Sequence, residues 1–271
     1  MPQESEQQDY ETQPPPKDGT IAAQGYFGAA ISAFRLLDFI VDLVTRIDRV
    51  AYRARQVLEG SHQCKSLEPS ALATTDAGRA TKFLRQNKQI LLELFLTRLV
   101  DNFQTYLVDL VRAVLHSKPA MLSTSQRALT LEELLKYDRI EDLVHDIVER
   151  QVNDLAYEGF IQLRSWCEKR GLEVNVPDTD VDAVVELIAT RNVIAHNRGL
   201  VDEKYLRAVP NPRFRLGEVR SIHVDDLFSA LGLLNQVVAG TDRLAAEKFQ
   251  LPTTPLSADD VFARGFRELR A

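Results

Sequence analysis

Apolar residues recur at helical spacing along most of the chain. Large apolar side chains return every three or four residues over 26–58, over 81–117 and over 134–155. The second of these segments stops before Pro119, because the proline ring disfavours helical backbone at the preceding Lys118. The pattern predicts long helices, each with one face turned toward a core.

Shorter helices are expected in the second half of the chain. The letters "TLEE" from Thr130 form a capping box, which marks a helix start. Pro177 and Asp178 predict the start of a further helix, and a glycine such as Gly199 is typical just past a helix end. The expected segments are 130–155, 157–170, 178–198 and 225–247, with a short extra helix near 257–269.

Only one stretch alternates as a strand does. Residues 200–224 contain Pro210, Pro212 and Gly217 and are expected to form a loop. A short hairpin near 213–224 fits the letters "RFRLGEVRSIHV". The chain is therefore predicted to be all-α, a bundle of long antiparallel helices.

The composition suggests four parts. Residues 1–24 are rich in Gln, Glu and Pro and predict a disordered acidic tail. An N-terminal helix and linker follow over 25–84, a helical domain over 85–250 and a C-terminal extension over 251–271.

The net charge of the chain does not favour binding to an anionic partner such as RNA. The net charge is −6, of which residues 1–20 carry five acids and one lysine, or −4, so the other 251 residues sum to −2. An RNA-binding surface would need a local basic patch.

Neither a membrane nor a metal is expected. The most apolar stretch is interrupted by Arg35, Asp38 and Asp42, and the polar first residues do not resemble a secretory signal, so a cytoplasmic location is predicted. Cys64 forms an H-x-C pair with His62, but the chain offers no second pair to complete a tetrahedral set. No metal and no cofactor are therefore predicted.

The letters "RNVIAHNRG" form the one candidate reaction site. Spacing alone is not informative, because Arg139 and His145 in "RIEDLVH" have a similar separation with acids between them. Asn192 and His196, in contrast, are i and i+4 neighbours on one helix face, with Arg191 at its flank.

These three side chains suit RNA cleavage. Arginine offers a planar, charged fork for phosphate oxygens, and histidine can carry a proton at neutral pH. In RNA the 2′-hydroxyl attacks its own phosphate, so proton transfer and charge stabilisation suffice. The alternative is structural: the polar groups cap the helix end, and Arg191 pairs with Glu186 or Asp182 on its own helix.

The region around the motif is locally basic. Residues 191–220 hold seven basic and three acidic residues, a net charge of +4. Asn197, Arg198 and Lys204 follow the motif most closely and are the candidate RNA-binding residues.

The letters "RNVIAHNRGLVDEKYL" resemble the motif of the HEPN superfamily, in which an arginine is followed after four to six residues by a histidine. The upstream "DNFQTYLVDLVRAVLHSKPAML" is similar to the long family helix beside it, and the likeness covers about 85–247. It implies a metal-independent endoribonuclease of toxin or antiviral-defence type that leaves a 2′,3′-cyclic phosphate.

The resemblance also implies roles and partners. His196 would transfer protons, Arg191 would stabilise the phosphate and Asn192 would orient the substrate. A homodimer would bring two motifs together, and an antitoxin or regulatory protein would restrain the enzyme. Some HEPN domains are non-catalytic binding or regulatory modules, and that alternative stays open.

Overall fold

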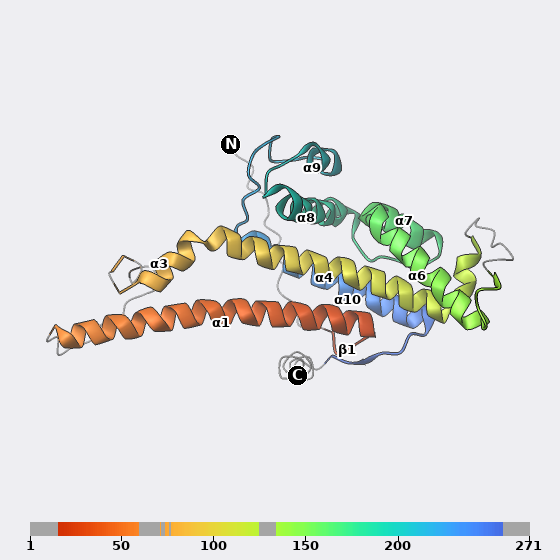
Figure 1. Ribbon diagram of the computed structural model, residues 1–271, viewed down its shortest axis with the longest axis horizontal. Coiled ribbons are helices and arrows are strands. Elements are labelled where there is room, and N and C mark those ends of the chain that lie inside the picture. Colours follow the sequence, from red (N-terminus) through yellow and green to blue (C-terminus); the bar gives the residue numbers. More distant parts are fainter. Residues whose placement is uncertain (1–15, 60–70, 72–73, 76, 125–133, 257–271) are drawn as a thin grey trace.

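The computed structural model describes residues 16–59, 71, 74–75, 77–124 and 134–256 (Figure 1). The predicted all-α fold is confirmed, since helices make up nearly all of the regular structure. The elements are β1 (Asp18–Gly19), α1 (Ile21–Leu58), α3 (Arg79–Gln86), α4 (Lys88–Ser117), the 3-10 helix η1 (Pro119–Thr124), α6 (Ile140–Glu158), α7 (Phe160–Lys169), α8 (Asp178–Asn197), α9 (Glu203–Ala208), α10 (Val224–Phe249) and β2 (Thr254–Pro255).

Helix α4 is the centre of the bundle. It packs against α1, α6, α8 and α10 and carries thirteen buried residues, including Phe103 and Leu115, which are fully buried. Its apolar side chains therefore point in several directions rather than to one face, as expected of a helix enclosed by others. Tyr26 of α1 and Tyr106 of α4 pack with ring centroids 6.1 Å apart in this core.

The two ends of the described chain meet beside α10. β1 pairs antiparallel with β2, and Leu256 N–H donates to the Lys17 carbonyl at 2.7 Å. Thr20 caps α1, and its N–H and hydroxyl both donate to the buried Asp242 carboxylate, at 2.9 and 2.5 Å. Residues 16–24, expected in the acidic tail, are thus ordered by backbone pairing and a buried hydrogen-bonded link.

Burial raises the pKa of the Asp242 carboxyl above its ordinary value. The two hydrogen bonds from Thr20 act in the opposite direction. The link therefore depends on Thr20 supplying donors to a carboxylate that has little contact with water.

A break at Asn87 divides the helix that was expected to run unbroken over 81–117. α3 and α4 meet there, and no side chain of α3 caps its own N-terminus. Asp48 of α1 does so instead: its carboxylate, only 2% exposed, accepts from the N–H groups of Ala80 and Thr81 at 3.1 and 2.6 Å. This contact anchors α3 along α1.

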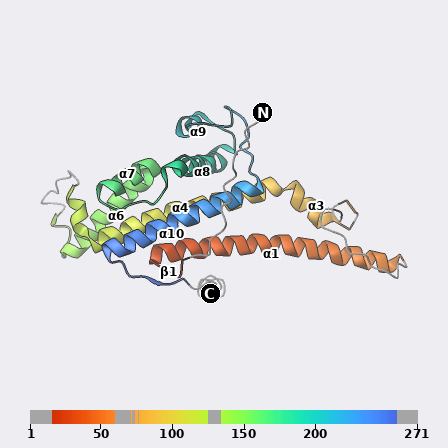
Figure 2. The same ribbon diagram turned by 180° about the vertical axis from the view of Figure 1, so that it is seen from behind.

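The distal part of α1 has a second, exposed apolar face. At 1.5 Å per residue the 38 residues of α1 span about 57 Å, and its C-terminal part extends past α4, where α3 is the one described helix beside it (Figures 1 and 2). Leu36, Leu43, Val50 and Val57 recur every seven residues and are 54%, 43%, 67% and 64% exposed. A seven-residue apolar repeat is typical of a helix that packs against another helix.

The loop over 200–224 differs from the prediction. It contains α9, and no hairpin forms within 213–224; the antiparallel bridge joins Leu200 to Val219 instead. The N-terminal helix is also not a separate unit, since α1 shares one core with the segment 85–250. The expected capping box at Thr130 and the helix near 257–269 lie outside the described residues.

Replacing Asp48 by alanine is expected to lower the free energy of unfolding by about 1–3 kcal/mol, because two helix-terminal N–H groups lose their buried acceptor. Hydrogen exchange should quicken first in α3, since Asp48 is the group that caps it. Asp42→Ala on the same helix is the matched control, because Asp42 forms only an exposed ion pair with Arg46. Equal destabilisation by both variants would contradict the capping role.

Candidate functional site

Helix α8 presents the "RNVIAHNRG" segment with one buried and one open face. Ala189 and Val193 are buried and pack in a small apolar cluster with Tyr205 of α9. Asn192 and His196 are exposed on the other side of the helix. The expected common face of these two residues is therefore present and open to solvent.

The end of α8 is fixed by two residues with positive φ. Arg198 has φ 55° and Gly199 has φ 75°, and the N–H groups of both donate to the Val193 carbonyl. The left-handed turn thus begins one residue earlier than expected, at Arg198, and Gly199 continues it. It places His196 in the last turn of α8 and starts the path toward the Leu200–Val219 bridge.

Arg191 is held by an acid from a different helix. Its Nε donates to Oδ1 of Asp101 on α4 at 2.5 Å, and the two side chains are 26% and 34% exposed. Its Nη1 donates to Oδ1 of the neighbouring Asn192 at 3.0 Å. The expected alternative partners on α8, Glu186 and Asp182, do not pair with it, so Arg191 bridges α8 to α4.

The pair leaves part of the guanidinium available. Nε and Nη1 are engaged, and no other described side chain bonds Arg191. Nη2 therefore has no side-chain partner in the described part of the chain, while Asp101 fixes the orientation of the planar group. An arginine pre-oriented in this way loses less freedom when it binds a phosphate.

His196 has no hydrogen-bond partner among the described residues. His196 is exposed, one helical turn from Asn192 on the same face of α8. The described part of the chain thus places Asn192 and His196 on one open face of α8, with Arg191 at its flank, and supplies no group that orients the histidine.

The candidate RNA-binding residues lie in different settings. Asn197 donates from Nδ2 to the Leu200 carbonyl at 2.7 Å and so stabilises the turn that follows α8. Arg198 and Lys204 are exposed, on that turn and on α9. Acid is also close by, since a Cβ added to Gly199 would lie 3.8 Å from Oε1 of Glu93 on α4.

Arg220, one of the seven basic residues of the segment 191–220, does not belong to an exposed basic surface. It is 9% exposed, and its guanidinium lies 3.5 Å from Glu186 and 3.7 Å from Asp226, with its Cζ 4.7 Å from the Phe214 ring centroid. It therefore ties α8, the 200–224 loop and α10 together. The local positive charge open to an RNA is smaller than the sequence indicated.

Tyr205 completes this buried network. Its hydroxyl donates to Oε1 of Glu186 at 3.1 Å, and burial followed by the charge of Glu186 raises its pKa above the ordinary value. Glu186 is thereby committed to Tyr205 and Arg220, which explains why it is not the partner of Arg191.

Asp101 is the site residue that the sequence reasoning missed. It lies 90 positions before Arg191, and its place on α4 shows no local pattern that distinguishes it from other helix-surface acids. Only the packing of α4 against α8 brings the two together.

Cys167 offers no alternative nucleophile. The thiol is 1% exposed, and burial raises its pKa to about 12, so the thiolate is not populated near neutral pH.

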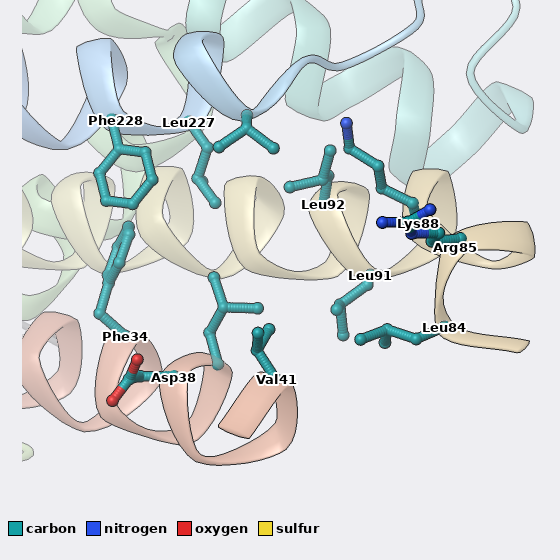
Figure 3. A pocket seen from close by; sticks show the side chains of 12 residues that line it. Phe34, Asp38, Val41, Leu84, Arg85, Lys88, Leu91, Leu92, Leu227 and Phe228 are labelled. Atoms are coloured by element: carbon teal, nitrogen blue, oxygen red, sulfur yellow. The ribbon is translucent and has the colours of Figure 1, made fainter. Parts of the chain in front are cut away.

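A separate apolar pocket lies between α1, the α3–α4 junction and the start of α10 (Figure 3). Its volume is about 500 Å³, within the range of small-molecule sites. Phe34 and Phe228 line one end, with ring centroids 5.9 Å apart, and Arg85 and Lys88 lie at the other. None of the RNA-cleavage candidates lines it.

Comparison of the chain with protein-family models, with curated protein sequences and with solved structures gave no match. Within the described residues, no helix combines the length and the apolar character needed to cross a membrane.

Replacing Arg220 by alanine is expected to lower the free energy of unfolding by about 1–3 kcal/mol, because Glu186 and Asp226 would lose a largely buried counter-charge. Chemical denaturation measures the change. Arg207→Ala on the exposed surface of α9 is the matched control, with an expected effect within about 0.5 kcal/mol. A stable Arg220→Ala protein would show that the network contributes little.

Proposed function

We propose that the protein is a metal-independent endoribonuclease of HEPN type, acting as a toxin or antiviral-defence effector. One observation carries the proposal: Asn192 and His196 lie exposed on one face of α8, and Arg191 at the flank of that face bonds both Asn192 and Asp101. This combination offers a charged guanidinium and an accessible imidazole on the same helix end, and a phosphate would share the guanidinium with Asp101.

The reaction needs no group beyond these side chains. The 2′-oxygen of the RNA bonds to phosphorus while an imidazole accepts the hydroxyl proton, and the bond from phosphorus to the 5′-oxygen breaks. A protonated imidazole donates to that leaving oxygen, and the product keeps a 2′,3′-cyclic phosphate. The Nη2 edge of Arg191 balances the charge that develops on the phosphoryl oxygens.

Two proton-transfer groups favour a homodimer. One His196 serves as base and the His196 of a second copy serves as acid, because a single imidazole cannot hold both protonation states at once. The open face of α8 is available for such an arrangement, and a regulatory or antitoxin partner would act by covering the same surface.

The test is RNA cleavage by the purified chain in excess chelator. His196→Ala is expected to lower the cleavage rate about 10²–10⁴-fold, the usual contribution of a general acid or base. Arg191→Ala should also reduce the rate, because the phosphate loses its cation. Mass spectrometry of the products identifies the 2′,3′-cyclic phosphate.

Arg139→Ala is the matched control, because Arg139 is an exposed arginine that precedes a histidine at similar spacing. It should cleave as the wild type does, and circular dichroism should show that all three variants are folded. No cleavage of any RNA, or equal cleavage by wild type and His196→Ala, would exclude the ribonuclease.

A second candidate function is a non-catalytic dimeric interaction module, which the exposed apolar face of α1 favours. Leu36, Leu43, Val50 and Val57 form a stripe that a helix of a second copy would cover. α1 lies on the opposite side of α4 from α8 (Figures 1 and 2), so this contact would leave His196 uncovered.

Replacing Leu43 and Val50 together by glutamate is expected to shift the protein from dimer to monomer, since four buried carboxylates per dimer would face apolar side chains. Sedimentation velocity reports the mass. Ile161→Glu on α7 makes the same change at an isolated apolar residue, 47% exposed, and should leave the mass unchanged. A wild-type monomer at all concentrations would refute this contact.

A further inference from the structure

Two histidines and a glutamate meet where α4 and α6 pack together. His116 lies in the last turn of α4, and His145 and Glu149 are one helical turn apart on α6. One potential ligand atom from each of the three residues lies within 4.8 Å of the other two. The two imidazole rings are stacked, with centroids 5.3 Å apart and planes inclined by 21°.

We propose that His116, His145 and Glu149 form a binding site for a divalent transition metal of the zinc class. Two imidazole nitrogens and one carboxylate oxygen are a ligand set that zinc accepts, with water in the remaining position. Zinc–ligand bonds of about 2.0–2.1 Å place tetrahedral ligands roughly 3.3 Å apart. The three groups must therefore draw together by an ångström or so, which the two exposed histidine side chains can do by small rotations.

Arg112 prepares Glu149 for this role. Its Nε donates to Oε1 of Glu149 at 2.8 Å, which fixes the carboxylate and leaves Oε2 for a metal. Asp109 forms a second ion pair with Arg112 and offsets the positive charge that would otherwise repel a cation. Such a partner that orients a ligand is a regular feature of metal sites.

The site is separate from the proposed RNA-cleavage surface. His116 follows Asp101 by 15 residues on α4, or about 22 Å at 1.5 Å per residue. A metal here would join α4 to α6 and stabilise the fold without contact with Arg191 or His196. The test of zinc binding and the test of RNA cleavage therefore have independent outcomes.

The experiment uses the full chain, stripped with chelator and titrated with zinc chloride. Isothermal titration calorimetry should give one zinc per chain, and the midpoint of thermal unfolding should rise with zinc concentration, because the metal binds the folded state. Cobalt(II) should give the visible absorption of a low-coordinate nitrogen and oxygen site.

Each of His116→Ala, His145→Ala and Glu149→Gln should weaken zinc binding at least tenfold. His196→Ala controls for histidine removal in general and should bind as the wild type does. A His62→Ala, Cys64→Ser double variant tests the other pair of potential ligands in the chain. Wild-type zinc binding by the His116 and His145 variants, loss of binding only in the His62 and Cys64 variant, or no binding at all would overturn the proposal.

Discussion

The enclosure of α4 by four other helices is the constraint on which the rest of the structure depends. A helix that is apolar in several directions must be surrounded, and α1, α6, α8 and α10 supply the surfaces that surround it. Thirteen of its thirty residues are buried, and polar contacts form at some of the seventeen others. Asp101 occupies one of them beside α8, and His116 occupies another beside α6.

Helical periodicity was sufficient to predict the architecture, because each long helix turns at least one apolar stripe to α4. The exceptions have physical causes that are not local. The break at Asn87 is stabilised by Asp48, which lies 33 positions before the Thr81 that it caps. The order of residues 16–24 comes from β2 and Asp242, at the opposite end of the chain.

The candidate site was predictable only in its local part. The positions of Asn192 and His196 follow from helix geometry, so their common open face could be read from the sequence. The partner of Arg191 could not, because an ion pair across two helices depends on their packing. Arg220 was predicted wrongly. The sequence assigns its charge to a basic surface, but the guanidinium is largely buried and pairs with Glu186 and Asp226.

The contact between Thr20 and Asp242 also orders the events of biosynthesis. α1 leaves the ribosome before α10, and the acid that secures its first turn follows Thr20 by 222 residues. At translation rates of about 5–20 residues per second, that interval lasts roughly 10–45 seconds. α4, the main packing partner of α1, is complete once Ser117 has been made, in the first half of this interval, whereas α10 is still incomplete at its end. The nascent chain therefore passes through a state in which a chaperone, or a neighbouring nascent chain, can occupy the surface of α1 that α10 later covers.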